Sequence, residues 1–340
     1  MRKSTVFRTI AATMLAVIMT IGAVGCSTGP KPIVVVWYPN ESYTAYDDTR
    51  AEIGGLIEQA TGRKVVHKTT TDYTIAIQSI ASGSADIAMA MGAVGYIEAK
   101  NRNPNVDVLF VNADKNGKLD EAKYFSWICV NKADADRYMS GGAYSIDNIK
   151  GKSMSFVSNS STSGFRVPTS LIISHFTSDN LNEDKLITGG SDKFFREVLF
   201  GGSHQASAFN LISGKSEVAA FCDIELNTYV ELKSGTENTV GAVYAVKQDA
   251  TAPFNTVVGK EFVLIAVAPV FNGPNAYNPK NLSHDEIKAI RDLFTSSVVT
   301  NNRKIFYDRS VDPEAIGLYN IASSKGYILV DDSWYDPYRR

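Results

Sequence analysis

Ser82-Gly83-Ser84-Ala85-Asp86-Ile87-Ala88-Met89 is matched in kind, position for position, by Ser213-Gly214-Lys215-Ser216-Glu217-Val218-Ala219-Ala220, 131 residues further along the chain. Each stretch has the pattern of a helix end, a glycine that stops the helix, an acidic residue and a buried strand. Because the match recurs in the same strand–helix context, we expect one such unit in each of two similar α/β lobes.

The segments on either side of these stretches alternate between predicted strands and helices. Ile33–Trp37 is a continuous apolar run between two prolines, which is typical of a strand buried on both faces. A helix capped by Asp47 or Asp48 and stopped at Gly62 follows it. Further strands are predicted at 65–66, 87–90, 152–157, 218–222 and 261–268, and further helices at 72–83, 165–176, 194–200, 206–212 and from 283 onward. This alternation predicts an α/β fold with parallel sheets.

The domain organisation follows from length and from the strand ends. A chain of 340 residues exceeds what one hydrophobic core usually organises. The predicted strands end at Met91-Gly92 and at Cys222-Asp223, and ligands of open α/β sheets bind beyond such ends, so both should face one cleft between the lobes. We predict a signal peptide (1–25), a lipidated tether (26–32), a discontinuous first lobe (33–130 and 260–340) and a second lobe (131–259).

The N-terminus predicts export. Arg2, Lys3 and Arg8 precede an apolar stretch, 9–24, that is short for a membrane span, and small residues lead from it to Cys26. This pattern favours a secretory signal peptide and resembles a bacterial lipobox, with cleavage before a lipidated Cys26; a transmembrane anchor is the alternative. Because two or more acyl chains hold a protein stably at a membrane, we expect a lipid-anchored protein on the extracytoplasmic face of the cell membrane.

Composition and net charge indicate which kind of partner the chain is suited to bind. The chain is 44% hydrophobic and 21% charged, which is typical of a globular protein. Without residues 1–25 it has 31 basic and 36 acidic residues, a net charge of −5, so we expect no nucleic-acid partner. Cys129 and Cys222 lie in apolar runs, which favours buried free thiols. A disulfide between them is the alternative.

The strongest local signal for a binding site is the hydroxyl-rich segment Ser158-Asn159-Ser160-Ser161-Thr162-Ser163-Gly164. It lies between a predicted strand and a predicted helix, and a helix N-terminus carries unpaired N–H donors and about half a positive charge. Such a segment holds an oxyanion without a cationic side chain. An ordinary helix cap followed by a polar loop is the alternative, although a cap needs only one hydroxyl.

Three further positions are candidates for ligand contact. His204, after Ser203 at the next helix start, could donate to an anion or could be a capping or surface histidine. Tyr96 follows Gly92 just past a strand end, so its hydroxyl could reach a ligand, although a packed aromatic is the commoner role. Asp223, at the other strand end, could accept from a ligand ammonium or could cap a helix.

Motifs of common enzymes are absent from the sequence. It contains no Gly-x-Ser-x-Gly elbow, His-Glu-x-x-His, P-loop or Gly-x-Gly-x-x-Gly. The remaining histidines do not form a set, and no pair of carboxylates suggests acid/base chemistry. We therefore expect neither catalysis, nor a cofactor, nor a bound metal.

Several short stretches together resemble a known family. They are Trp37-Tyr38-Pro39-Asn40-Glu41-Ser42, Thr71-Asp72-Tyr73, Met91-Gly92-Ala93 with Tyr96, Ser161-Thr162-Ser163-Gly164-Phe165 and Gly201-Gly202-Ser203-His204. Through them the chain, from about Ile33 to about Phe306, resembles the lipoprotein branch of the phosphate-, phosphite- and phosphonate-binding proteins of ABC importers. This resemblance implies an α/β, two-lobed type II periplasmic-binding fold with a ligand cleft between the lobes.

The resemblance also implies roles for individual residues. The hydroxyl run would bind the oxyanion at a helix N-terminus, and a tyrosine and a Ser-His pair would complete the cradle. These roles fall on Ser161, Thr162, Ser163, Tyr96, Ser203 and His204, with Gly92 beside them. The family often has Asp after Ser-His, and here Gln205 takes that place. Acidic residues hold the amino group in aminophosphonate binders, for which the candidates are Asp223, Glu225 and Glu41.

We therefore predict a monomeric, lipid-anchored solute-binding protein that closes two lobes around a small phosphonate-like oxyanion and delivers it to an ABC permease. Three alternatives remain open from the sequence. The same fold could bind a neutral or zwitterionic solute, the chain could be an extracytoplasmic enzyme on a two-lobed scaffold, or it could be a surface interaction lipoprotein.

Overall fold

The computed structural model describes residues 30–40, 46–312 and 315–339, and its main compact unit is Ile33–Arg340. None of the helices described in it is long and apolar enough to cross a bilayer. The predicted signal peptide and the lipidation site Cys26 lie outside the described residues, as does Glu41.

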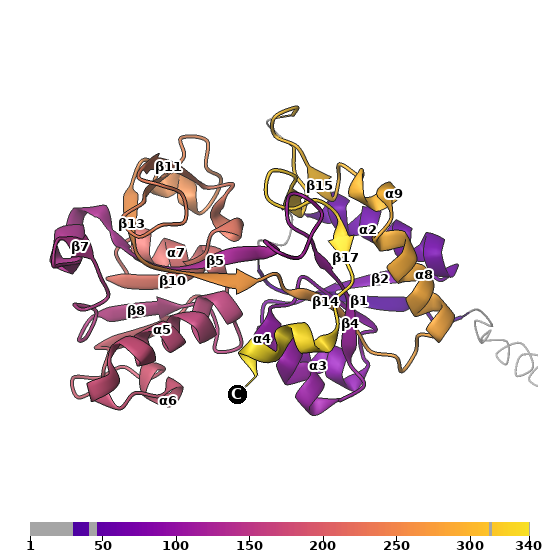
Figure 1. Ribbon diagram of the computed structural model, residues 1–340, viewed down its shortest axis with the longest axis horizontal. Coiled ribbons are helices and arrows are strands. Elements are labelled where there is room, and N and C mark those ends of the chain that lie inside the picture. The colour runs from indigo at the N-terminus through magenta and orange to yellow at the C-terminus, as the bar shows by residue number, and fades with distance from the viewer. Residues whose placement is uncertain (1–29, 41–45, 313–314, 340) are drawn as a thin grey trace, which may run out of the picture. The chain divides into compact units, whose positions relative to one another are not determined.

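The first lobe is built on a six-stranded sheet with the strand order β17-β4-β14-β3-β1-β2. Its strands are β1 (Ile33–Trp37), β2 (Val65–Thr69), β3 (Ile87–Met89), β4 (Asp107–Asn112), β14 (Pro274–Tyr277) and β17 (Tyr327–Ile328). Its helices are α2 (Asp47–Thr61), α3 (Tyr73–Ser82), α4 (Ala93–Arg102), α8 (His284–Phe294) and α9 (Ser297–Thr300). Apolar residues of α2 and α8 pack in one buried cluster and those of α3 and α4 in another, so the helices cover opposite faces of the sheet (Figure 1).

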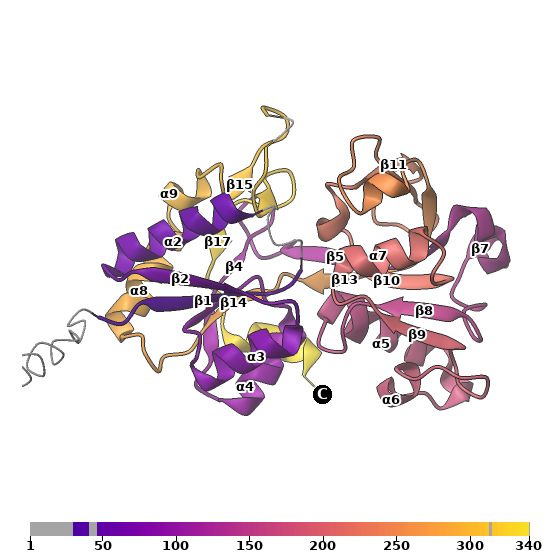
Figure 2. The same cartoon turned by 180° about the vertical axis from the view of Figure 1, so that it is seen from behind.

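The second lobe is built on a seven-stranded sheet with the strand order β11-β12-β13-β5-β10-β8-β9. Its strands are β5 (Lys123–Asn131), β8 (Ser153–Phe156), β9 (Glu197–Phe200), β10 (Val218–Cys222), β11 (Val230–Ser234), β12 (Val243–Val246) and β13 (Glu261–Phe271). Its helices are the π-helix η2 (Thr162–Arg166), α5 (Val167–His175), α6 (Glu183–Leu186) and α7 (His204–Ile212). The strands β5 and β13 lead toward the first lobe in both views of the chain (Figure 2).

Short elements complete the fold. They are the strands β6 (Met139–Ser140), β7 (Ala143–Tyr144), β15 (Phe306–Tyr307) and β16 (Tyr319–Asn320) and the 3-10 turns η1 (Lys132–Tyr138), η3 (Thr177–Asp179), η4 (Ile224–Leu226), η5 (Phe254–Thr256) and η6 (Asp332–Tyr338).

The two lobes share one topology, which confirms the prediction from the repeated stretches. In each sheet three parallel strands stand in the order second, first, third along the chain (β2-β1-β3 and β9-β8-β10), and an antiparallel strand follows. The acidic residue of each stretch makes the same contact. Asp86 Oδ2 accepts from the Val34 N–H at 2.8 Å, and Glu217 Oε2 accepts from the Ser153 N–H at 3.1 Å.

Removal of one of these anchors should destabilise the fold. The substitution Asp86→Ala is expected to lower the free energy of unfolding by about 2–3 kcal/mol, because it leaves the Val34 N–H without its charged acceptor. Asp86 is 2% exposed and also accepts from Asn281 Nδ2 at 2.9 Å. Urea unfolding followed by circular dichroism measures the change, with the exposed Asp120→Ala as a control expected to shift stability by less than about 0.5 kcal/mol. Equal stabilities of the two variants would contradict this role for Asp86.

Most predicted elements are present, and their errors have local causes. The helix predicted at 194–200 is wrong: Glu197–Phe200 is strand β9, which pairs in parallel with β8. Its short apolar run has no turn signal that separates a strand from a helix. The first helix is capped by the backbone of Tyr46, while Asp47 and Asp48 stand in its first turn. The helix predicted from 165 begins earlier, as the π-helix at Thr162.

The connection between the lobes runs through β5 and β13. These strands pair with each other from Lys123–Phe271 to Asn131–Phe262, entirely within the seven-stranded sheet. By hydrogen bonding, the second lobe therefore begins at β5 and ends at β13, before β14 joins the first sheet. The predicted lobe boundaries, after residues 130 and 259, stay a proposal, which this pairing would move to about 122 and 272.

Candidate functional site

One cleft collects residues from both lobes. It has a volume of about 1090 Å³, which includes its mouth open to solvent. Strand ends and the loops after them line it, as the topology of open α/β sheets predicts. From the first lobe these include Met91 and Gly92 after β3, and from the second lobe Cys222 at the end of β10.

Three helix N-termini open into this cleft. Gly92 is the N-cap of α4 in the first lobe, Ser161 is the N-cap of η2 in the second lobe, and His204 is the first residue of α7. All three residues line the cleft. Since each helix N-terminus carries a partial positive charge and N–H groups without partners in the helix, their convergence favours an anion.

The hydroxyl run lies at the second of these N-termini. The side chains of Ser161, Thr162 and Ser163 line the cleft, and each residue is at most 2% exposed. Ser161 Oγ accepts from the Gly164 N–H at 3.1 Å, and Thr162 Oγ1 accepts from the Val94 N–H at 3.0 Å. A hydroxyl that accepts one such bond keeps its own proton to donate. The turn is therefore a helix cap and also presents donors to the cleft.

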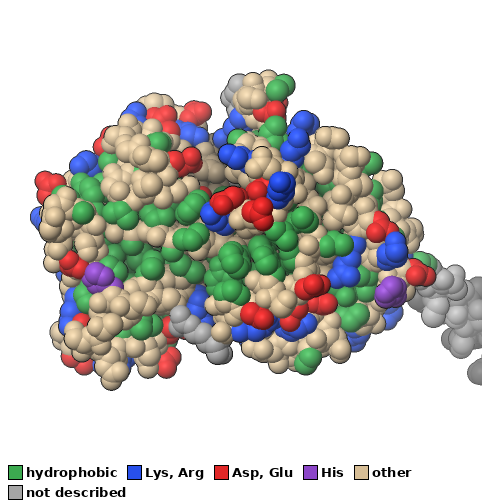
Figure 3. All heavy atoms as spheres, viewed as in Figure 1, with side chains coloured by type: hydrophobic (Ala, Val, Ile, Leu, Met, Phe, Trp, Pro, Cys, Tyr) green, Lys and Arg blue, Asp and Glu red, His purple; other side chains and the backbone are tan. Residues whose placement is uncertain are grey.

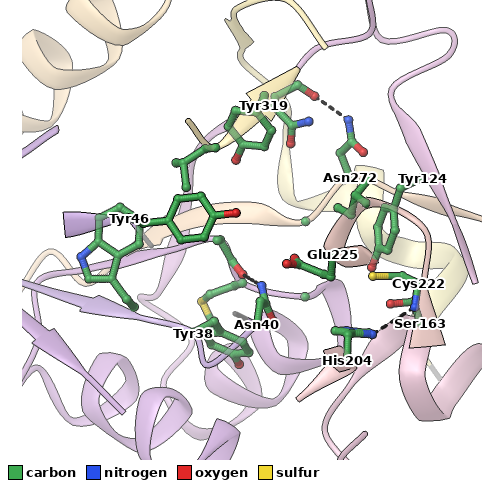
Figure 4. A pocket seen from close by; sticks show the side chains of 18 of the residues that line it. Tyr38, Asn40, Tyr46, Tyr124, Ser163, His204, Cys222, Glu225, Asn272 and Tyr319 are labelled. Carbon is green, nitrogen blue, oxygen red and sulfur yellow. Dashed lines mark hydrogen bonds between the residues drawn. The ribbon is translucent and has the colours of Figure 1, made fainter. Parts of the chain in front are cut away.

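His204 lies beside the hydroxyl run as a neutral donor. Its Nδ1 accepts from the Cys222 N–H at 3.1 Å, so the proton of the neutral ring is on Nε2 (Figure 4). Burial lowers the pKa of His204 to about 3, because the charged ring would lose its hydration. The preceding Ser203 caps α7 by accepting from the Ala206 N–H at 3.2 Å and is not among the residues that line the cleft.

The other side of the cleft is aromatic. Figure 4 shows Tyr46 and Tyr319 across the cavity from Ser163 and His204, with the Glu225 carboxylate between the two sides. Trp37, Tyr307 and Leu318 also line the cleft. We refer to Trp37, Tyr46, Tyr307 and Tyr319 together as the aromatic wall.

Arg50 is the one Lys or Arg among the described residues that line the cleft. Its guanidinium lies 5.5 Å from the centre of the Trp37 ring, and its Nη1 pairs with Asp47 at 3.0 Å. This charge is therefore already paired and lies beside the aromatic wall.

Besides Ser203, two predicted ligand residues, Tyr96 and Asp223, do not line the cleft. Tyr96 is fully buried, and its hydroxyl donates to Asp332 at 2.5 Å and lies 3.3 Å from Asp107, so it joins α4 to the C-terminal segment. Asp223 accepts from the Phe125 N–H at 2.9 Å and thereby fastens the end of β10 to the start of β5. Burial raises the pKa of Asp223 to about 7.

The structure adds residues to which the sequence analysis gave no role. Ala90 lines the cleft at a positive φ of 56°, which is unfavourable for alanine. Its N–H donates to Asn275 Oδ1 at 3.0 Å, and its carbonyl accepts from Asn40 Nδ2 at 2.9 Å. Tyr73 in turn donates to Asn40 Oδ1 at 2.9 Å. In the sequence, Asn40 belongs to the stretch 37–42 that resembles the family, whereas no motif gave Ala90 a role in the site.

Cysteines and metal ligands add little to the site. Cys129 and Cys222 are both free and buried, and Cys222 lines the cleft. Within the ranges that the structure describes, no three His, Cys, Asp or Glu residues lie together as a metal site.

Comparison with known proteins agrees with this geometry. A family model described as "ABC transporter, phosphonate, periplasmic substrate-binding protein" matches residues 35–335. Among curated proteins, the phosphate-import protein PhnD of Mycolicibacterium smegmatis is 26% identical over 239 residues, which cover 66% of this chain and 68% of that protein.

Solved structures show the same fold. A binding-protein component of an ABC phosphonate transporter from Pseudomonas aeruginosa matches with a TM-score of 0.64 at 19% identity, over 92% of this chain and 85% of that one. PhnD1 from Prochlorococcus marinus, solved in complex with methylphosphonate, matches with a TM-score of 0.63 at 15% identity, over 91% and 96% of the two chains. These likenesses confirm the predicted two-lobed periplasmic-binding fold.

Proposed function

We propose, because this chain belongs to the family of periplasmic substrate-binding proteins of phosphonate ABC transporters, that its cleft captures a small oxyanion of the phosphonate, phosphite or phosphate type. The observation that supports this most is the convergence of the N-termini of α4, η2 and α7 on one end of the cleft. Ser161, Thr162, Ser163 and His204 would contact the oxyanion there, with Gly92 beside it.

Capture would be local. Acidic and basic side chains are interspersed over the face in Figure 3, and the chain without residues 1–25 has a net charge of −5. Long-range attraction of an anion therefore contributes little. Peptide dipoles and neutral donors fixed at the closed cleft would supply the stabilisation.

The aromatic wall would hold the substituent of the phosphonate. Of the three acidic candidates for an amino group, Glu225 lines the cleft, Asp223 does not, and Glu41 lies outside the described residues. A carboxylate beside tyrosines and a tryptophan favours a cationic substituent over a second anion. Glu225 is therefore our candidate for that contact.

Calorimetric titration of the exported chain with methylphosphonate, phosphite and phosphate tests the proposal. We expect at least one of them to bind with a dissociation constant in the micromolar range or below. Ser163→Ala should weaken that binding about 10- to 100-fold, since a hydrogen bond to a charged group contributes about 1.5–3 kcal/mol. Ser174→Ala, exposed on α5 outside the cleft, is the control. No heat with any of the three oxyanions would reject this ligand class.

The anchor, the oligomeric state and the partner are further parts of the proposal. The N-terminal pattern supports lipidation of Cys26, delivery to an ABC permease would follow from the family, and a single chain supplies both walls of the cleft. The family's members are transport proteins, which supports binding without turnover. A variant that begins at residue 27 behind a cleavable signal peptide, and therefore lacks Cys26, should leave the membrane fraction and run as a monomer on gel filtration. Retention of that variant in the membrane would contradict an anchor at Cys26.

A further inference from the structure

The lobes also touch behind the anion end of the cleft. Ser160 Oγ, in the second lobe, donates to Glu98 Oε2 on α4 of the first lobe at 3.1 Å. Two residues further on, Thr162 Oγ1 accepts from the Val94 N–H, also on α4. Neither Glu98 nor Ser160 is among the residues that line the cleft.

Apolar packing reinforces these two hydrogen bonds. Val157 follows β8 of the second lobe and is fully buried, yet it belongs to the same buried cluster as residues of α3 and α4. Gly92 lies close on the other side, since a Cβ atom there would be 2.8 Å from Thr162 Oγ1. Val157, Ser160 and Thr162 therefore each contact the first lobe.

The charges at this junction favour an additional attachment between the lobes. The N-termini of α4 and η2 face the same space from opposite lobes, and their partial positive charges repel when no anion lies between them. Glu98 brings a carboxylate to this junction, where its side chain is 30% exposed and its Oε2 is 4.0 Å from Arg102 Nη2. Burial raises the pKa of Glu98. The charges of Arg102 on α4 and of Arg166 in the second lobe act in the opposite direction. A partly desolvated acceptor makes the bond from Ser160 stronger than one in water.

We infer that Glu98, Ser160 and Val157 form a clasp between the lobes that holds the cleft closed and positions Thr162 for the ligand. These three are positioning residues, because they lie outside the cleft lining. The clasp sets how long a bound ligand stays, and only the identity of that ligand depends on the proposed function.

Hydrogen exchange of the ligand-free protein tests the clasp without any ligand. In Glu98→Ala and in Ser160→Ala, the peptide that covers the first turns of α4 should exchange about 5- to 30-fold faster, which corresponds to about 1–2 kcal/mol. Glu52→Ala is the matched control, because Glu52 is also a helical glutamate, 27% exposed, that accepts from Asn302 and Lys304 within the first lobe. The double variant Glu98→Ala/Ser160→Ala should be no faster than the single variants.

Dissociation kinetics provides the second measurement. Methylphosphonate should leave both single variants about 5- to 30-fold faster than the unchanged protein, with association rates within about threefold. Exchange rates of Glu98→Ala and Ser160→Ala equal to that of the Glu52→Ala control would overturn the clasp. If none of methylphosphonate, phosphite and phosphate binds, the proposed function fails, and exchange of the ligand-free protein still decides the clasp.

Discussion

Gly92→Ala is expected to weaken binding of methylphosphonate at least about 100-fold while the protein stays folded. In the closed cleft the new Cβ would lie 2.8 Å from Thr162 Oγ1, closer than such atoms approach. Rotation of the Thr162 side chain relieves the contact only if the hydroxyl gives up the Val94 N–H and its place at the anion end. Each of these losses affects a charged or buried hydrogen bond, and two of them together amount to about 3 kcal/mol.

The backbone conformation at Gly92 does not require glycine. Its φ of −76° suits any residue, so Gly92→Ala should leave the isolated first lobe unstrained. Gly55→Ala is the matched control, because a Cβ at Gly55 in α2 meets no atom within 4 Å. Calorimetry gives the affinity and thermal unfolding gives the stability. Equal affinities of the two alanine variants would show that close approach of the lobes at Gly92 is not needed for binding.

Acidification is expected to destabilise the protein through His204. The ring is neutral in the folded state down to a pKa of about 3, whereas in the unfolded chain it takes up a proton below about pH 6.5. The unfolded state therefore binds more protons in this interval, and stability falls as the pH falls. One group contributes up to about 1.4 kcal/mol per pH unit, and integration from pH 7.5 to pH 5 gives about 2 kcal/mol.

Comparison with His204→Asn isolates this effect. An asparagine amide keeps an acceptor for the Cys222 N–H but does not titrate. Asp223 acts in the opposite direction, since its raised pKa of about 7 makes the folded state bind the extra proton below pH 7, and both proteins share that contribution. Urea unfolding at pH 7.5 and pH 5, without phosphate in the buffer, should show a smaller loss in His204→Asn by about 2 kcal/mol. Identical losses would mean that His204 is protonated in the folded protein.

Local sequence signals predicted much of the fold and part of the site. The apolar run at 33–37 and the signals for helices at 72–83 and from 283 onward act over a few residues, and each of these elements appears in the structure as expected. The hydroxyl run lines the cleft for the same reason, because a loop between a strand and a helix sets the direction of its own N-terminus.

Contacts between distant segments were not predictable in this way. Tyr96 follows a strand end, but the C-terminal segment supplies Asp332, 236 residues away, which binds its hydroxyl. Asp223 likewise contacts Phe125 on a strand from a different part of the chain. Glu225 and Tyr319 reach the same cleft from different lobes, and no spacing in the sequence relates them. The aromatic wall therefore became visible only in three dimensions.

The long pairing of β5 with β13 has a mechanical consequence. Because β5 and β13 pair along their length in one sheet, with one register shift between Leu264 and Ala266, the second lobe should move as one body up to Phe271. Bending would then fall on its two connections to the first lobe, residues 113–122 and the pivot at 272–273. At that pivot Gly273 lies so close to the Met91 carbonyl that a Cβ would be 1.8 Å from it. A small rotation there, next to the end of β3, would swing Ser161–Ser163 away from Gly92 without deforming either sheet. Release of the ligand would then be a hinge motion in which a short segment bends and the whole second lobe moves.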